Sequence, residues 1–120
     1  MKDSVKNKDI YERTFKFALD VIKLIDELPK RTATFVLGDQ VIRSACSMGA
    51  NLREAKQARS KKEFISSFGT ALKEAEETIY WLSLIKESKL TDAGKCDRLI
   101  QECEEIINIL ATIILKAKRK

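Results

Sequence analysis

The chain has 120 residues, of which 44% are hydrophobic and 34% charged, and its formal net charge is +5 at pH 7. This balance is too hydrophobic for a disordered chain, and no apolar run reaches the roughly 18 residues of a membrane span. Histidine is absent, which removes the commonest general base and transition-metal ligand. The length predicts one domain over residues 1–120. The N-terminus lacks a signal-peptide core, so the cytoplasm is the expected location.

One proline and four glycines leave few helix breakers, so long helices are expected throughout. The apolar pattern predicts four of them, over about residues 8–28, 34–58, 61–88 and 92–117. In the first helix, apolar residues recur at steps of three and four: Ile10, Thr14, Phe17, Val21, Leu24 and Leu28. Pro29 then disfavours helical geometry in the residue before it, which ends this helix near Leu28.

The second helix is expected to be capped by Thr32 or Thr34. It is rich in small residues, which allow close approach of a neighbouring helix. Glycine inside a helix costs about 1 kcal/mol relative to alanine, so a packing gain must offset Gly38 and Gly49. Ser60 and Glu63 form a capping-box pattern, which predicts that the third helix starts at Lys61.

The fourth helix has the most regular apolar stripe, and Thr91 is the expected cap. Four helices joined by short loops predict an all-α, antiparallel, up-down-up-down four-helix bundle. Apolar residues beyond the core stripes mark a candidate oligomer surface, or else ordinary exposed groups beside a wide core: Phe15, Ile65, Tyr80, Trp81, Ile109 and Leu115. The three cysteines, Cys46, Cys96 and Cys103, lie on apolar stripes and are expected to be buried.

This topology gathers basic residues at one end of the bundle, where both termini and the second loop meet. The candidate nucleic-acid-binding residues are Lys56, Arg59, Lys61, Lys62, Lys116, Lys118 and Arg119, with Lys2, Lys6, Lys8 and Lys120 adding to the charge. Clustered Lys and Arg favour phosphate binding by counterion release. The alternative is a solvated end with a basic tail. Aromatic residues are not interleaved, so stacking on single-stranded bases has little support.

The antiparallel pairing of the second and third helices also predicts polar contacts. Arg43 is expected near Glu76 or Glu77, and Arg53 near Ser66. Carboxylates at helical spacing sometimes hold metals, but a di-metal bundle normally needs Glu-x-x-His pairs. We therefore expect no metal, cofactor or catalytic site. A structural polar role is expected for Arg43, Asn51, Glu54, Ser60, Glu63, Glu74 and Glu77.

The segment "QVIRSACSMGANLREAKQARSKKEFISSFGTALKEAEETIYWLSLI" resembles the four-helix-bundle family of proteins encoded in intervening sequences of bacterial 23S rRNA genes. The pattern is S-x-x-x-N-x-x-E, then S-K-x-(D/E)-F, then A-L-x-E-x-x-E-T. Its matching residues are Ser47, Asn51 and Glu54, then Ser60, Lys61, Glu63 and Phe64, and then Ala71, Leu72, Glu74, Glu77 and Thr78. "REAKQARS" replaces the glycine-containing A-E-G-x-G-R-x-S of another branch.

The resemblance implies a ring-forming bundle, often a homopentamer, without enzyme activity. It also implies similarity to the accessory bundle of diversity-generating retroelements, a basic pentamer that engages nucleic acid and a reverse transcriptase. Our leading hypothesis is a non-enzymatic homo-oligomer that binds RNA or DNA through its basic end. The second hypothesis is a protein–protein interaction scaffold that does not bind nucleic acid directly.

Overall fold

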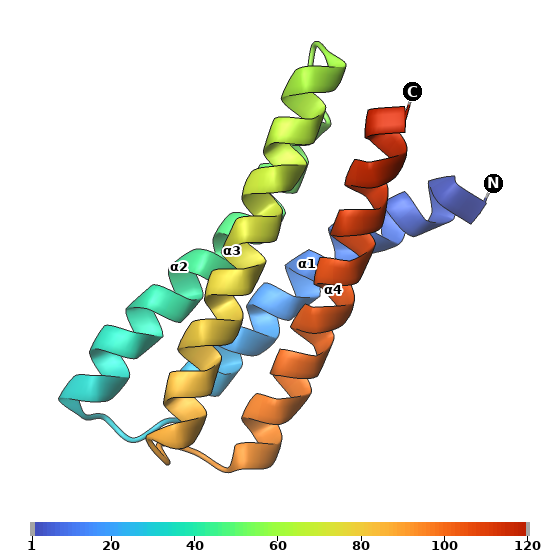
Figure 1. Cartoon of the computed structure of the whole chain (residues 1–120). Coiled ribbons are helices and arrows are strands. Elements are labelled where there is room, and N and C mark those ends of the chain that lie inside the picture. The colour runs from blue at the N-terminus through green and yellow to red at the C-terminus, as the bar shows by residue number, and fades with distance from the viewer. Residues whose placement is uncertain (1, 120) are drawn as a thin grey trace.

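The computed structural model describes the backbone of residues 2–119 and the side chains of residues 10–119. It contains four helices: α1 (Lys2–Asp26), α2 (Thr32–Ala55), α3 (Lys61–Glu87) and α4 (Ala93–Arg119). Each helix packs against the next, and α1 also packs against α4 (Figure 1). The predicted up-down-up-down bundle is therefore confirmed. Along the described part of the chain, no helix has the length and hydrophobicity needed to cross a bilayer.

The start of α2 differs from the sequence prediction. Arg31 is the N-cap residue and its side chain makes no capping hydrogen bond. Instead, the Thr34 hydroxyl donates to the carbonyl oxygen of Pro29 at 2.6 Å. Neither Thr32 nor Thr34 caps the helix as expected, because Thr32 is already helical and Thr34 ties the helix to the preceding loop.

The starts of α3 and α4 use side-chain caps. The Ser60 hydroxyl accepts a hydrogen bond from the Glu63 amide at 3.1 Å, which is the first half of the expected capping box. Within the described residues, no return bond from the Glu63 side chain is present. At α4 the Asp92 carboxylate accepts from the Gly94 amide at 3.2 Å, so Asp92, and not Thr91, satisfies an amide at this helix start.

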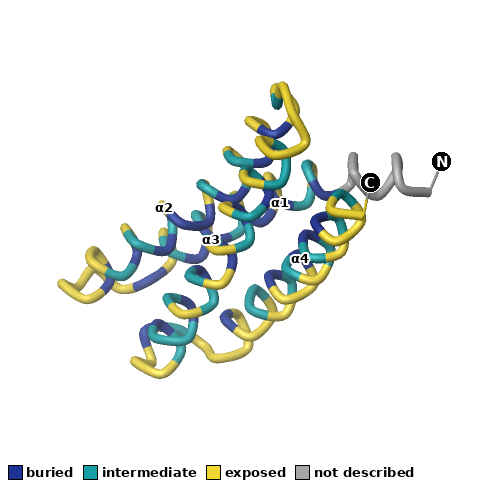
Figure 2. The backbone as a smooth tube through the Cα atoms, turned by 45° about the horizontal axis from the view of Figure 1, so that its top comes forward, coloured by how far each residue is buried: buried dark blue, intermediate teal, exposed yellow. Residues whose placement is uncertain are grey.

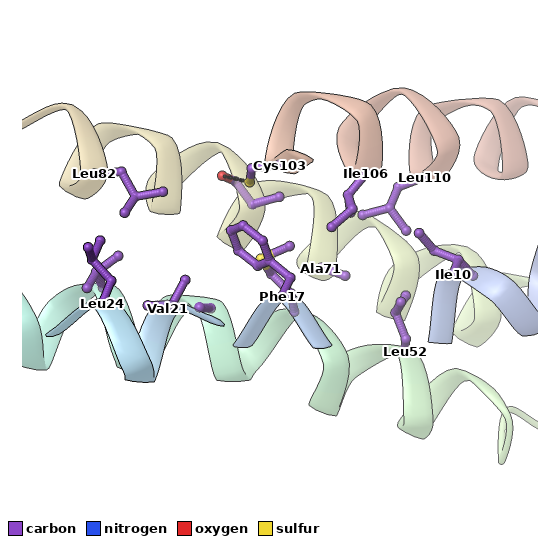
Figure 3. Close-up of a cluster of buried hydrophobic side chains, with 14 of the residues drawn as sticks. Ile10, Phe17, Val21, Leu24, Leu52, Ala71, Leu82, Cys103, Ile106 and Leu110 are labelled. Carbon is purple, nitrogen blue, oxygen red and sulfur yellow. Dashed lines mark hydrogen bonds between the residues drawn. The ribbon is translucent and has the colours of Figure 1, made fainter. Parts of the chain in front are cut away.

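The core runs along the bundle axis and takes side chains from every helix (Figure 3). Buried positions recur along the inward face of each helix (Figure 2). The stripe predicted for the first helix is buried from Ile10 to Leu24 in α1 and at Leu28, two residues beyond the observed end of the helix at Asp26. The core also includes two of the cysteines, Cys96 and Cys103. Burial raises the pKa of Cys103 to about 12, with smaller contributions from nearby glutamates.

Two expectations about the surface need correction. Cys46 is exposed, because its position on α2 faces outward beside α1 and away from the core. Among the expected surface residues, Phe15, Tyr80 and Leu115 are more than half exposed. The other three are partly buried and pack against the core, namely Ile65, Trp81 and Ile109. The apolar surplus of the sequence is therefore divided between the core margin and the surface.

Two glycines of α2 lie against α1, and at one of them, Gly38, there is no room for a Cβ atom. A Cβ atom at Gly38 would lie 2.8 Å from Cγ2 of Ile25, closer than two such carbon atoms pack. A Cβ atom at Gly49 would lie 3.5 Å from the hydroxyl of Thr14. The close packing of the Ile25 side chain on Gly38 is the packing gain that offsets the helical cost of glycine there.

Candidate nucleic-acid interface

The turn between α2 and α3 lies at the same end of the bundle as the C-terminal end of α4 (Figure 1). This follows from the antiparallel topology, since α2 and α4 run toward this end and α3 runs away from it. Residues 56–60 join the two helices, and we include the first two residues of α3, Lys61 and Lys62, in this turn. The fold thus brings two basic segments, far apart in the sequence, to one end.

The basic side chains of the turn are exposed to solvent: Lys56, Arg59, Lys61 and Lys62. Within the described part of the chain, Arg59, Lys61 and Lys62 form no ion pair. Lys56 is engaged, because its ammonium group lies 4.2 Å from the centre of the Tyr11 ring of α1. Such a cation–π contact holds the Lys56 side chain against α1. Arg59, Lys61 and Lys62 are therefore the residues of the turn most available to a phosphate.

The last turns of α4 add three exposed basic residues, Lys116, Lys118 and Arg119. Positive charge is favourable at this position, because the unpaired carbonyl groups of a helix C-terminus carry partial negative charge. This placement gives the three residues a local structural role as well as a candidate binding role. Lys2, Lys6, Lys8 and Lys120 lie outside the residues whose side chains are described.

At the opposite end of the bundle, some lysines form ion pairs with acids of neighbouring helices. Lys86 pairs with Asp97 at 2.8 Å, and this contact raises the pKa of Lys86. Lys95 lies 3.4 Å from the carboxylate of Glu27. Two lysines there are therefore partly neutralised by acids on neighbouring helices. Lys30, Arg31 and Lys89 are exposed there without an ion pair in the described residues, but nearby acids balance the charge of this end: Asp26, Glu27, Glu87, Asp92 and Asp97. The excess positive charge therefore lies at the other end of the molecule.

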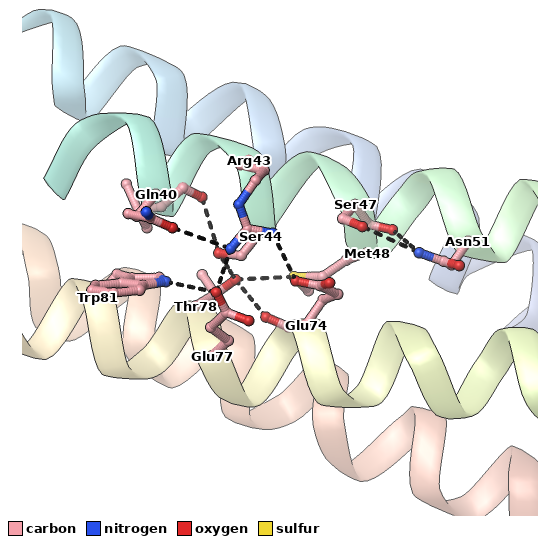
Figure 4. A network of polar contacts seen from close by, with 11 residues as sticks. Gln40, Arg43, Ser44, Ser47, Met48, Asn51, Glu74, Glu77, Thr78 and Trp81 are labelled. Carbon is pink, nitrogen blue, oxygen red and sulfur yellow. Dashed lines mark hydrogen bonds and ion pairs between the residues drawn. The ribbon is translucent and has the colours of Figure 1, made fainter. Parts of the chain in front are cut away.

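The expected contact of Arg43 with α3 is present and centres on Glu77 (Figure 4). The Arg43 guanidinium donates to the Glu77 carboxylate and also to the side-chain oxygen of Gln40 at 3.2 Å. The Trp81 indole donates to the same carboxylate at 3.0 Å. The Trp81 hydrogen bond and then Arg43 lower the pKa of Glu77. The cluster keeps Glu77 ionised, which suits a structural contact between helices and not a general acid.

Glu74 lies one turn before Glu77, and its carboxylate has fewer contacts than that of Glu77. One of its carboxylate oxygens is buried, 3.6 Å from a nitrogen of Arg43. This separation permits an electrostatic attraction but exceeds a hydrogen bond, and that oxygen has no hydrogen-bond donor. Figure 4 shows Glu74 beside Arg43 and the adjacent hydroxyl pair. Glu74 therefore supplements the ion pair between α2 and α3.

The remaining polar residues of the motif act locally. The Asn51 amide donates to the Ser47 carbonyl at 2.8 Å and to its hydroxyl at 3.2 Å, so these hydrogen bonds stay within α2. Glu54 is exposed at the end of the same helix. The guanidinium carbon of Arg53 lies 6.0 Å from the centre of the Phe15 ring. Arg53 thus extends toward α1, not toward Ser66 of α3 as its position in the hairpin predicts.

The structure adds a contact that the sequence pattern did not reveal. Arg13 of α1 donates to both carboxylate oxygens of Glu102 of α4, at 3.0 and 2.6 Å, and to Glu105 at 3.1 Å. A two-oxygen contact of this kind fixes orientation as well as charge. The sequence signal is faint, because α1 and α4 lie at opposite ends of the chain and their register follows only from the closed bundle.

Within the part of the chain that the structure describes, no group of three or more cysteine, aspartate or glutamate side chains has a metal-binding arrangement. Glu77 of α3 contacts Arg43 and Trp81, and Glu102 and Glu105 of α4 contact Arg13. The chemistry that these residues support is electrostatic contact. The exposed basic residues at the end of the bundle are a candidate surface for an anionic ligand.

Comparison with known proteins agrees with this architecture. The model of the 23S rRNA-intervening sequence protein family matches residues 6–112. A crystal structure of a protein of unknown function from the S23 ribosomal protein family of Bacteroides thetaiotaomicron is similar, with a TM-score of 0.85 and 35% sequence identity. The similarity covers 91% of this chain and 97% of that one. No curated protein matches the sequence. The chain belongs to the 23S rRNA-intervening sequence protein family.

Proposed function

We propose that this protein is a non-enzymatic, homo-oligomeric helical bundle that binds RNA or DNA through its basic end. The observation that carries the proposal is the exposure of Arg59, Lys61 and Lys62 on one short turn, without an acidic partner in the described residues. Phosphate groups release condensed counterions when such side chains contact them. The end of α4, with Lys118 and Arg119, enlarges the same positive surface.

The expected binding mode is to the nucleic-acid backbone and not to base edges. The turn offers long, exposed cationic side chains and no exposed aromatic ring that would stack on a base. We therefore propose little sequence preference and strong dependence on salt. Oligomerisation would repeat the basic end and raise the overall affinity by multivalency. The ring of five that the family resemblance predicts, and a cytoplasmic site of action, are part of this proposal.

A salt titration tests the backbone-contact mode. The protein is titrated into labelled duplex RNA, duplex DNA and single-stranded RNA at several salt concentrations between 50 and 200 mM, and fluorescence anisotropy reports binding. The proposal predicts that the logarithm of the association constant falls linearly with the logarithm of salt, with a slope of about −0.9 per phosphate contact on duplex DNA. Affinity that is independent of salt, or absence of binding at 50 mM salt, would contradict it.

A scaffold for protein partners is the second candidate function. The exposed Tyr80 on α3 and Leu115 on α4 favour it, because large apolar side chains at the surface often mark protein contacts. A partner held this way would stay bound after nuclease treatment and in high salt. Recovery of the same partner under both conditions, together with absence of direct nucleic-acid binding, would favour the scaffold over the basic-end model.

A further inference from the structure

We infer that the outer face of the α1–α2 seam pairs with the same face of a second copy of this chain, through an antiparallel two-fold contact centred on Cys46. The face contains a shallow, mostly apolar hollow of about 240 Å³. Phe15 and Leu19 line this hollow, and their side chains are 57% and 43% exposed. This contact goes beyond the proposed function, because it lies on the side of the bundle and not at its basic end.

The register between α1 and α2 locates the centre of this face. Thr14 is level with Gly49, and Ile25 is level with Gly38, as their close approaches show. Both contacts describe one antiparallel register. Cys46 precedes Gly49 by three residues, and Phe17 follows Thr14 by three residues. Because the two helices are antiparallel, both steps run in the same direction along the seam. Cys46 on α2 and Phe17 on α1 are therefore at the same height along the seam.

The charges of α2 are arranged symmetrically about this height. Arg53 lies seven residues after Cys46 and Asp39 lies seven residues before it. Seven residues are two helical turns, so all three occupy one stripe, about 10 Å apart in succession. All three are exposed, and Asp39 has no ion-pair partner within the described residues. An antiparallel second copy would place Arg53 of each chain opposite Asp39 of the other, and Cys46 opposite Cys46.

Exposed residues of α1 are also arranged about the height of Cys46 and Phe17. Phe15 and Leu19 lie two residues on either side of Phe17, so a two-fold contact would pack each against the other in the second copy. Glu12 lies five residues before Phe17 and Lys23 lies six residues after it, and both are exposed. Each Glu12 would therefore face a Lys23. Arg53 with Asp39 and Phe15 with Leu19 share one centre, and Glu12 with Lys23 lies within half a residue of it, as an isologous contact requires.

The size and chemistry of the hollow fit this occupant. Its floor contains the small side chains of Ala18, Cys46 and Ala50, together with Gly49, so a second helix pair would approach closely. The aromatic ring of Phe15 from the other chain would fill the apolar space. A ring uses two different faces of each subunit, whereas this contact uses one face twice. It would join free chains in pairs.

Oxidative cross-linking at Cys46 tests the two-fold arrangement directly. Copper phenanthroline removes one electron and one proton from each of two facing thiols, and a disulfide forms between them. At low micromolar concentration we expect a covalent pair on a non-reducing gel. Cys46→Ser should abolish the pair, while a Cys96→Ser/Cys103→Ser variant should retain it. Failure to cross-link, while a soluble maleimide still labels Cys46, overturns the proposal.

Charge exchange supplies an independent test. Arg53→Asp and Asp39→Arg each create two like-charge contacts in the pair, and each should weaken self-association about tenfold in sedimentation equilibrium. The combined Arg53→Asp/Asp39→Arg chain should associate as the unaltered protein does. If the combined variant self-associates no more tightly than the single variants, the proposed register is wrong. Circular dichroism confirms folding, and anisotropy on the same variants measures nucleic-acid binding, so failure of the pairing is distinguished from failure of the proposed function.

Discussion

The hydroxyl oxygens of Ser44 on α2 and Thr78 on α3 lie 2.7 Å apart inside the buried seam between these helices. Thr78 also donates to the Glu74 carbonyl at 2.7 Å, which uses its single proton. The Ser44 hydroxyl also lies near a backbone acceptor, the Val41 carbonyl oxygen, but at the longer distance of 3.3 Å. We therefore assign Ser44 as the donor between the two hydroxyls. Each polar group is satisfied within the protein, which is the condition for burying a hydroxyl at little cost.

Ser44→Ala should destabilise the protein by about 1 kcal/mol, because the Thr78 oxygen loses its donor. Thr78→Val should cost a similar amount. The double variant should cost less than the sum of the single ones, since both remove the same hydrogen bond. Urea unfolding followed by circular dichroism measures the three free energies. Strictly additive effects would contradict a direct bond between the two hydroxyls.

The pair of Arg43 and Glu77 predicts a dependence of stability on pH. The pKa of Glu77 is lowered in the folded protein, so its carboxylate binds protons less readily there than in the unfolded chain. Its contribution is therefore present above the ordinary pKa of 4.5 and is lost as the pH falls through the folded value. Glu77→Gln should reduce the unfolding free energy at pH 7 more than at pH 3.5. Equal reductions at the two pH values would contradict this account.

The thiols should divide into one reactive and two protected groups. Cys46 is exposed, whereas Cys96 and Cys103 are buried and burial raises the pKa of both. At a protein concentration too low for chains to pair, a thiol reagent at pH 8 should label one cysteine per folded chain rapidly and all three after denaturation. Because the pKa of Cys103 is raised from 9.0 to about 12, its contribution to stability should decline as the pH rises above 9. Mass spectrometry identifies which thiol reacts first.

Two glycine substitutions should have opposite effects. Gly69→Ala in α3 places a methyl group where no atom lies within 4 Å, so it should stabilise the protein by about 0.5–1 kcal/mol through helix propensity. Gly38→Ala introduces a contact of 2.8 Å with Ile25 and should destabilise it by about 1–3 kcal/mol. Thermal unfolding of both variants measures the contrast. A stabilising Gly38→Ala would show that the α1–α2 seam is looser than described.

The fold was predictable because each helix has a regular apolar stripe. The stripe from Ile10 to Leu28 alone places α1 against the core. The ion pair of Arg43 with Glu77 also followed from the antiparallel register of a short hairpin. Periodicity alone did not separate a core position from one at the margin, which is why Cys46 was expected inside.

The candidate site was only partly predictable for a different reason. Charge and topology bring Lys56 and Arg59 to one end, but the contact of Lys56 with Tyr11 depends on how α1 crosses that end. The Arg13 contact with Glu102 likewise needs the geometry of the closed bundle. Sequence spacing describes neighbours on one helix well. It describes neighbours on helices distant in the chain only after the packing is known.

The most direct test of the basic-end model compares two triple variants with equal loss of charge. One replaces Arg59, Lys61 and Lys62 of the turn by glutamine. The matched control replaces Lys30, Arg31 and Lys89 at the opposite end, which are also exposed and without ion pairs in the described part of the chain. Lys56 is left intact, because its contact with Tyr11 would mix a structural effect with a loss of binding.

Binding of both variants to duplex DNA is measured by anisotropy across the same salt series. The account predicts that the turn variant loses affinity and that its salt slope becomes shallower by about 2–3 for each engaged chain, while the control retains both affinity and slope. Equal losses in the two variants would show that net charge alone attracts the nucleic acid. Unchanged binding by the turn variant would contradict the assignment of the basic end as the binding surface.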